Sequence, residues 1–203
     1  MANHCYNYIE FRGETEHIKK LARCFSLLMK VEYAPTFIEA CASVFQLLEV
    51  PEDAEYNYFG TKWFEVELSQ EPQLEYDYTD EDTKERFSES YFIVSGDSAW
   101  TPPEKLTQEL CKAYRVRARH EYEESGCDFA GILTIDEKGD YDEEEYTYRE
   151  CKYKYDQDWW WDEMVYTIQE RHYETFEEFF EDNGYAELGI LKEAWKIAHE
   201  KES

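Results

Sequence analysis

The spacing that most clearly suggests a chemistry belongs to an unbroken acidic run, Asp142, Glu143, Glu144 and Glu145. The tyrosines that follow alternate with polar residues, and this alternation predicts a single strand over residues 141–155. Same-face residues of a strand repeat every ~6.6 Å, so carboxylates on it would form a regular anionic row, as phosphates do along duplex DNA. The run therefore predicts either a surface that imitates nucleic acid or a solvated strand face kept soluble by its charge.

A second acidic segment covers residues 69–86 and is predicted to be a loop or the tip of a hairpin. It adds four candidate partner-binding carboxylates to those of the run: Asp77, Asp80, Glu81 and Asp82.

Three consecutive tryptophans, Trp159, Trp160 and Trp161, are further candidates for binding a partner, because tryptophan is favoured at the centres of protein interfaces. Three neighbours on one element cannot all point inward, so we expect at least one to be exposed or covered by a partner. The alternative is a junction between sheet and helices that aromatic side chains fill.

The net charge of this 203-residue chain is −27 at pH 7, yet 18% of its residues are aromatic, which indicates a folded core rather than disorder. A folded chain with so large a negative charge disfavours direct binding to nucleic acid or to anionic membranes, and favours basic partners. We therefore expect the partner to be a basic nucleic-acid-binding protein or a complex that contains one.

Catalytic and metal-binding patterns give no comparable signal. The 5 histidines form no HExxH, and the 6 cysteines form no CxxC. We predict no catalytic residue, no metal ligand and no cofactor, and we do not expect an enzyme. Cys24, Cys41 and Cys111 fit reduced core positions, and no secretory signal or membrane-length apolar run is seen, so we expect a reducing cytoplasm.

One concentrated basic row interrupts the acidic composition. Arg115, Arg117 and Arg119 share one face of a predicted strand, 115–123. We expect them to neutralise a neighbouring acidic strand through cross-strand pairs, with contact to nucleic acid as the alternative.

The order of predicted elements favours an α+β fold of the ferredoxin-like, split-βαβ type, in which an antiparallel sheet has helices on one face and continues as an extended β meander. Strands are expected at 5–12, 63–68, 87–95, 115–123, 129–135 and 141–155. Strands 5–12 and 115–123 are expected to alternate between two faces, and Glu65 and Glu67 to share one face of strand 63–68. Helices are expected at 15–29, 37–48 and about 104–114, the second capped by Thr36 and the third by Thr101 ahead of Pro102 and Glu104. Thr175 is expected to cap a short helix that ends near Gly184. We expect a domain over residues 1–155 and a helical C-terminal extension, 156–203, packed on or beside it.

Four motifs resemble the YubB-type ferredoxin-like domain family of phages, plasmids and mobile elements. They are MANHCYN at 1–7, FGTKW at 59–63, SAWTPP at 98–103 and ESGCDFAG at 124–131. The resemblance covers roughly residues 1–155, and it implies a fold, a mobile-element setting and a bacterial host cell rather than a reaction. Gly60 and Gly131 suit tight turns, and Trp63 and Trp100 suit core anchors.

Charge, fold and resemblance together favour an inhibitor that imitates DNA and occupies the DNA-binding channel of a bacterial defence effector, either a CRISPR–Cas complex or a restriction-type nuclease. One alternative is a small-ligand-binding protein or enzyme whose pocket lies between sheet and extension, near Trp63, Trp100 and His120. Another is an acidic accessory module that stabilises a basic partner.

Overall fold

The computed structural model describes residues 3–31, 34, 36–79, 86–171, 173, 175–184 and 186–200. They divide into two compact units, residues 1–145 and 146–203. The elements follow in the order β1 (His4–Gly13), α1 (Thr15–Leu28), α2 (Phe37–Val44), β2 (Phe64–Thr79), β3 (Arg86–Ala99), α3 (Glu104–Tyr114), β4 (Arg117–Glu124), β5 (Phe129–Ile135), β6 (Tyr141–Tyr146), α4 (Tyr148–Tyr155), α5 (Gln157–Arg171), α6 (Phe176–Asn183) and α7 (Leu188–Glu200).

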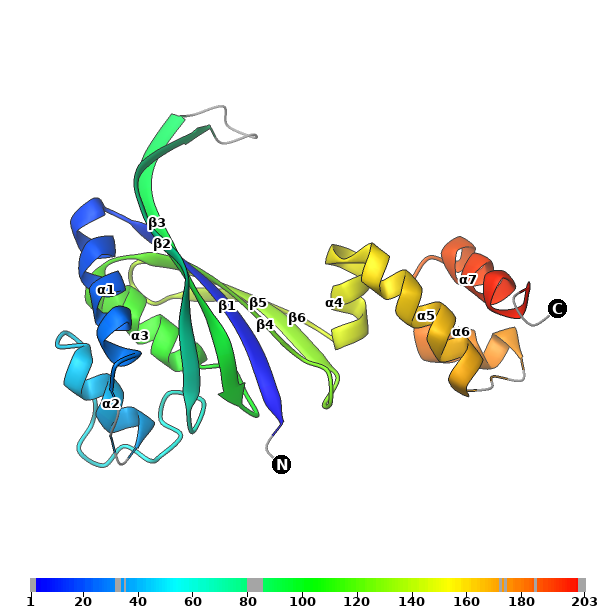
Figure 1. Cartoon of the computed structure of the whole chain (residues 1–203), viewed down its shortest axis with the longest axis horizontal. Coiled ribbons are helices and arrows are strands. Elements are labelled where there is room, and N and C mark those ends of the chain that lie inside the picture. The colour runs from blue at the N-terminus through cyan, green and yellow to red at the C-terminus, as the bar shows by residue number, and fades with distance from the viewer. Residues whose placement is uncertain are drawn as a thin grey trace. The chain divides into compact units, whose positions relative to one another are not determined.

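Among the described residues, six strands form one open sheet in the order β2-β3-β1-β4-β5-β6. β1 lies between β3 and β4 and is antiparallel to both. α1 follows β1 on the way to β2, and α3 joins β3 to β4, which is the split-βαβ arrangement (Figure 1). β5 and β6 then continue the sheet beyond β4. The predicted α+β, ferredoxin-like fold with a β meander is confirmed.

One face of the sheet is buried against α1 and α3 (Figure 1). In β1 the residues of that face are Cys5, Asn7, Ile9 and Phe11, each at most 1% exposed. Phe11 stacks on Phe92 of β3, with ring centroids 5.2 Å apart. The alternation predicted for β1 is confirmed, and so is that of β4, because the side chains of a strand point alternately to the two faces of its sheet.

The hairpin of β2 and β3 is longer than predicted. β2 runs to Thr79, so most of the segment expected to be a loop is strand, while residues 80–85 lie outside the described residues. The register of β2 on β3 shifts three times between Leu68 and Tyr76. Each shift breaks the two-residue alternation on which a strand prediction depends. The sequence pattern therefore did not indicate that β2 continues to Thr79.

The ends of two helices also differ from prediction. Thr101 does not cap α3, because its hydroxyl donates a hydrogen bond to the carbonyl of Gly60 and the helix begins at Glu104. Arg115 follows α3 in the left-handed conformation (φ 53°) and precedes β4, so it does not belong to the arginine row. α2 has the predicted Thr36 cap but ends at Val44.

The predicted strand over 141–155 is wrong in its second half. β6 ends at Tyr146, and α4 begins at Tyr148 after a capping box in which Thr147 accepts from the amide of Glu150 and the Glu150 side chain accepts from that of Thr147. This box satisfies two amides that a helix start otherwise leaves without partners. It outweighs the strand preference of the tyrosines.

The second unit, residues 146–203, has its own core between α5 and α7, which contact each other. Trp160, Met164 and Leu191 are at most 1% exposed there. Thr175 caps α6 as predicted, accepting from the amide of Glu178. None of the described helices is both long enough and apolar enough to cross a membrane.

Candidate functional site

The sheet face opposite α1 and α3 carries a row of acidic and aromatic residues across four strands. The register pairs Glu65 of β2 with Asp97 of β3, Asp97 with Tyr6 of β1, and Tyr6 with Glu123 of β4. Paired residues in neighbouring strands point to the same face. Asp97 and Glu123 therefore lie on either side of Tyr6, which is 45% exposed, and Glu65 lies beyond Asp97.

A second row lies two residues along each strand, ~6.6 Å from the first. It pairs Glu67 with Ser95, Ser95 with Tyr8, and Tyr8 with Glu121. Burial raises the pKa of Tyr8, and the carboxylates of Glu10 and Glu121 raise it further. Neither row includes a lysine or arginine. The five carboxylates of the two rows are called the acidic face: Glu65, Glu67, Asp97, Glu121 and Glu123.

A groove of about 390 Å³ lies at the part of the acidic face formed by β2 and β3, and Tyr6, Glu65, Glu67 and Asp97 are among the residues that line it. Its floor includes Gly96, whose φ is 146°. A Cβ atom at this position would lie 1.9 Å from the carbonyl oxygen of Glu65. Only glycine therefore allows β2 to approach β3 this closely, and the approach positions Glu65.

The acidic run of β6 does not form one row. The Tyr122 hydroxyl donates a 2.6 Å hydrogen bond to Glu143, so this carboxylate lies on the helix-covered side of the sheet. The strand alternation places Glu145 on that same side, and Asp142 and Glu144 on the other. The expectation of a single four-carboxylate row is corrected, because consecutive strand residues point to opposite faces.

Glu143 and Glu145 act electrostatically on Glu104, in the first turn of α3. Burial raises the pKa of Glu104 to about 7, and the two carboxylates of β6 contribute to the rise. This part of the acidic run therefore acts on α3, on the helix-covered side of the sheet.

The other predicted binding residues lie in two places. Asp77 is in β2, where its backbone pairs with Ser88 of β3, whereas Asp80, Glu81 and Asp82 lie outside the described residues. Trp160 is buried in the core of the second unit, and its neighbours Trp159 and Trp161 are half-buried against that core.

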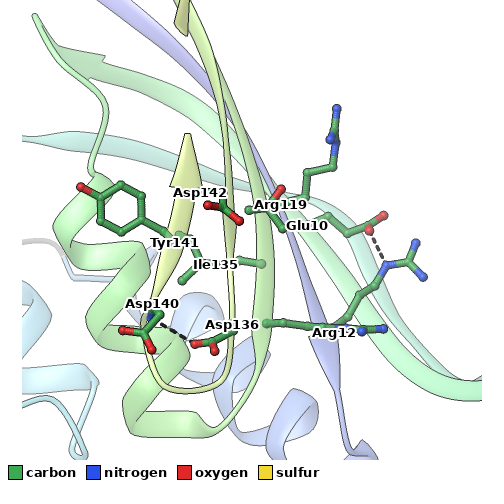
Figure 2. Close-up of a pocket in the computed structure, with 11 residues that line it drawn as sticks. Glu10, Arg12, Arg119, Ile135, Asp136, Asp140, Tyr141 and Asp142 are labelled. Carbon is green, nitrogen blue, oxygen red and sulfur yellow. Dashed lines mark hydrogen bonds and ion pairs between the residues drawn. The ribbon is translucent and has the colours of Figure 1, made fainter. Parts of the chain in front are cut away.

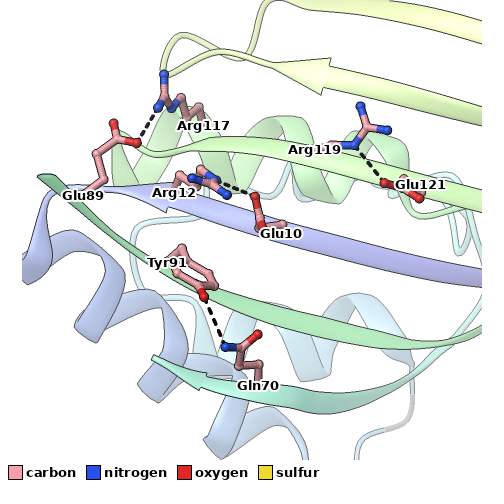
Figure 3. Close-up of polar contacts among 8 residues, drawn as sticks. All are labelled: Glu10, Arg12, Gln70, Glu89, Tyr91, Arg117, Arg119 and Glu121. Atoms are coloured by element: carbon pink, nitrogen blue, oxygen red, sulfur yellow. Dashed lines mark hydrogen bonds and ion pairs between the residues drawn. The ribbon is translucent and has the colours of Figure 1, made fainter. Parts of the chain in front are cut away.

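The arginines pair with carboxylates, but not with those of a neighbouring strand as expected. Arg117 pairs with Glu89 of β3, and Arg119 Nε donates to Glu121 of its own strand at 2.8 Å (Figure 3). On β1, Arg12 pairs with Glu10 (Figure 3). The arginines thus lie at one end of the sheet face, next to the acidic face.

His120 is not available to a surface pocket, since it is fully buried. Its Nε2 lies 3.0 Å from Asn7 Oδ1, and its Nδ1 lies 3.3 Å from the hydroxyl of Thr107. An amide oxygen only accepts, so Nε2 carries the proton. Trp100, predicted to be a core anchor, is 47% exposed with a φ of 70°, and Trp63 is half-buried.

The comparisons with known proteins bear on the fold. Residues 75–169, a little under half of the chain, match the family model described as a ferredoxin-like domain in Api92-like protein. The match begins within β2 and continues into α5. No curated protein matches the chain. No solved structure matches it either.

Proposed function

We propose that this chain binds the nucleic-acid-binding surface of another protein through the acidic face and thereby excludes DNA from it. The observation that carries the proposal is the register that sets Glu65, Asp97, Tyr6 and Glu123 in one row across four strands on one sheet face. The strands hold these carboxylates at fixed spacings, so their charge is organised before binding, as it is in a DNA backbone.

The chemistry of the face fits lysine and arginine side chains. A guanidinium or ammonium group in the groove would meet the carboxylates of Glu65 and Asp97 and the ring of Tyr6, and both kinds of contact are favourable for a cation. The net charge of −27 would speed association with a basic channel, and salt would weaken this attraction by screening it.

The class of target follows from the resemblance to domains of phages, plasmids and mobile elements. A protein encoded by such an element benefits from disabling a DNA-cutting defence of its host. We therefore propose a CRISPR–Cas complex or a restriction-type nuclease as the target, with the protein acting in the cytoplasm of the bacterial host as a DNA mimic.

Competitive elution tests the proposal. The tagged chain is immobilised, exposed to nuclease-treated bacterial lysate and washed, and bound protein is then eluted with duplex DNA. The control is elution with single nucleotides at the same ionic strength. We expect duplex DNA, but not single nucleotides, to release a nucleic-acid-binding protein. A captured protein that stays bound in excess DNA, or that binds DNA and this chain together, contradicts the proposal.

A further inference from the structure

A second groove, of about 680 Å³, lies at the arginine end of the sheet face (Figure 2). We call it the arginine groove, because Arg12, Arg117 and Arg119 line it. Its volume falls within the ~300–1,000 Å³ typical of small-molecule sites. In a chain with a net charge of −27, three guanidinium groups lining one groove form an unusual local environment.

The opposite side of the arginine groove is acidic. It includes Asp140 and Asp142, at the turn from β5 into β6 (Figure 2). Tyr141 also lines the groove, but its ring points away from the arginines (Figure 2). The turn is shaped by Asp136, whose Oδ1 accepts from the amides of Lys138 and Asp140 at 2.8 and 3.0 Å.

The arginine side is held in place by internal pairs. Arg119 Nε donates to Glu121, and Arg12 Nε pairs with Glu10. A guanidinium has five N–H donors in a rigid fork, so Arg119 can hold the carboxylate of Glu121 and a ligand anion at the same time. The internal pairs orient the arginines, and the groove therefore has guanidinium donors on one side and carboxylates on the other.

We infer that the arginine groove binds a small zwitterion, a molecule with a phosphate or carboxylate at one end and an ammonium or guanidinium group at the other. The anionic group binds Arg119, next to Arg12 and Arg117, and the cationic group binds Asp140 and Asp142. A purely anionic ligand would meet the four carboxylates of the groove and the field of the whole chain, and a purely cationic one would meet three guanidinium groups. A zwitterion avoids both repulsions. The arginine groove adjoins the acidic face through the pair of Arg119 with Glu121, but the inference does not depend on the function of that face.

Titration calorimetry on the full chain tests the inference with phosphoethanolamine, arginine and glycine as zwitterions that differ in charge separation. Inorganic phosphate and ethanolamine serve as the single-charge halves. We expect at least one zwitterion to bind about tenfold or more tightly than either half. Arg119→Gln and Asp142→Asn should each weaken that binding about tenfold, whereas Glu67→Gln, outside the groove, should not change it.

Three outcomes overturn the inference. The first is that none of the three zwitterions binds at millimolar concentration. The second is that phosphate alone binds as tightly as the best zwitterion. The third is that both substitutions leave the affinity unchanged. The melting temperature of each variant shows whether it is folded. If Arg119→Gln does not fold, Arg119→Lys is measured in its place. Asp142→Asn then still tests whether the acidic side of the groove contributes to binding.

Discussion

The hydroxyl of Tyr122, on β4, donates a 2.6 Å hydrogen bond to Oε1 of Glu143, on β6, although β5 lies between these strands. Gly131 of β5 is paired with Tyr122 and makes this reach possible, since a Cβ there would lie 2.2 Å from the tyrosine hydroxyl oxygen. Gly131 therefore lies within a strand, where its lack of a Cβ leaves room for the Tyr122 side chain to cross β5. It does not form the tight turn that its motif suggested. The bond fixes the acidic run of β6 to the sheet.

Replacing Tyr122 by Phe removes this bond and little else. Hydrogen bonds to charged groups contribute about 1.5–3 kcal/mol, so Tyr122→Phe should lower the free energy of unfolding by an amount in that range. Urea unfolding of the variant measures the change. Tyr141→Phe, on the exposed start of β6, is the matched control, and equal stability of Tyr122→Phe and the control would contradict the anchoring role.

Glu104 should make stability fall as the pH rises. The pKa of its carboxyl is about 7 in the folded chain against an ordinary value of 4.5, so the folded state holds the proton more tightly than the unfolded state. The contribution of Glu104 is full below pH 4.5 and is lost as the pH rises through 7. Glu104→Gln should therefore raise the melting temperature at pH 8 by a few degrees, with ~2–4 °C corresponding to 1 kcal/mol in a chain of this size. The same gain at pH 4.5 would show that the carboxyl is not responsible.

His120 should have the opposite effect over a lower pH range. Burial lowers its pKa to about 3 from an ordinary 6.5, so the unfolded chain binds a proton that the folded chain excludes. The stability from neutral His120 is present above pH 6.5 and is lost as the pH falls towards 3. His120→Gln should flatten the fall in melting temperature between pH 7 and pH 4. An unchanged slope would assign that fall to other groups.

Replacing each of the three consecutive tryptophans should have unequal effects on stability, because they differ in burial. Trp160 is 1% exposed in the core of the second unit, and core Trp→Ala substitutions cost about 3–5 kcal/mol. Trp160→Ala should therefore unfold this unit or destabilise it severely, whereas Trp159→Ala and Trp161→Ala should cost less. Circular dichroism during heating gives the comparison. Equal losses from all three substitutions would contradict this assignment.

Local patterns predicted the elements that are buried on one side only. β1 and β4 alternate cleanly because the helices bury every second residue, and Thr36 and Thr175 cap the helices that follow them. The capping box of Thr147 and Glu150 was also readable from the sequence, but the alternating tyrosines around it carried more weight. The bulged part of β2 had no pattern to read, because its register shifts interrupt the alternation.

The acidic face could be predicted only in part. The sequence placed Glu65 and Glu67 on one side of a strand, yet nothing local indicates that Asp97 and Glu123 are their neighbours. Such neighbours depend on the order of strands and on register, which are set by contacts between distant segments. The run of β6 was the more visible signal, but half of it faces the helices.

The most direct test of the account is a DNA-displacement titration on the captured nucleic-acid-binding protein, followed by the anisotropy of a labelled duplex. The variant carries Glu65→Lys, Glu67→Lys and Asp97→Lys. The control carries Glu52→Lys, Asp53→Lys and Glu55→Lys in the exposed loop after α2, with the same change in net charge. We predict that the natural chain and the control displace the duplex, while the face variant needs at least about tenfold more protein. Displacement by the face variant at the same concentration as the control would contradict the central claim.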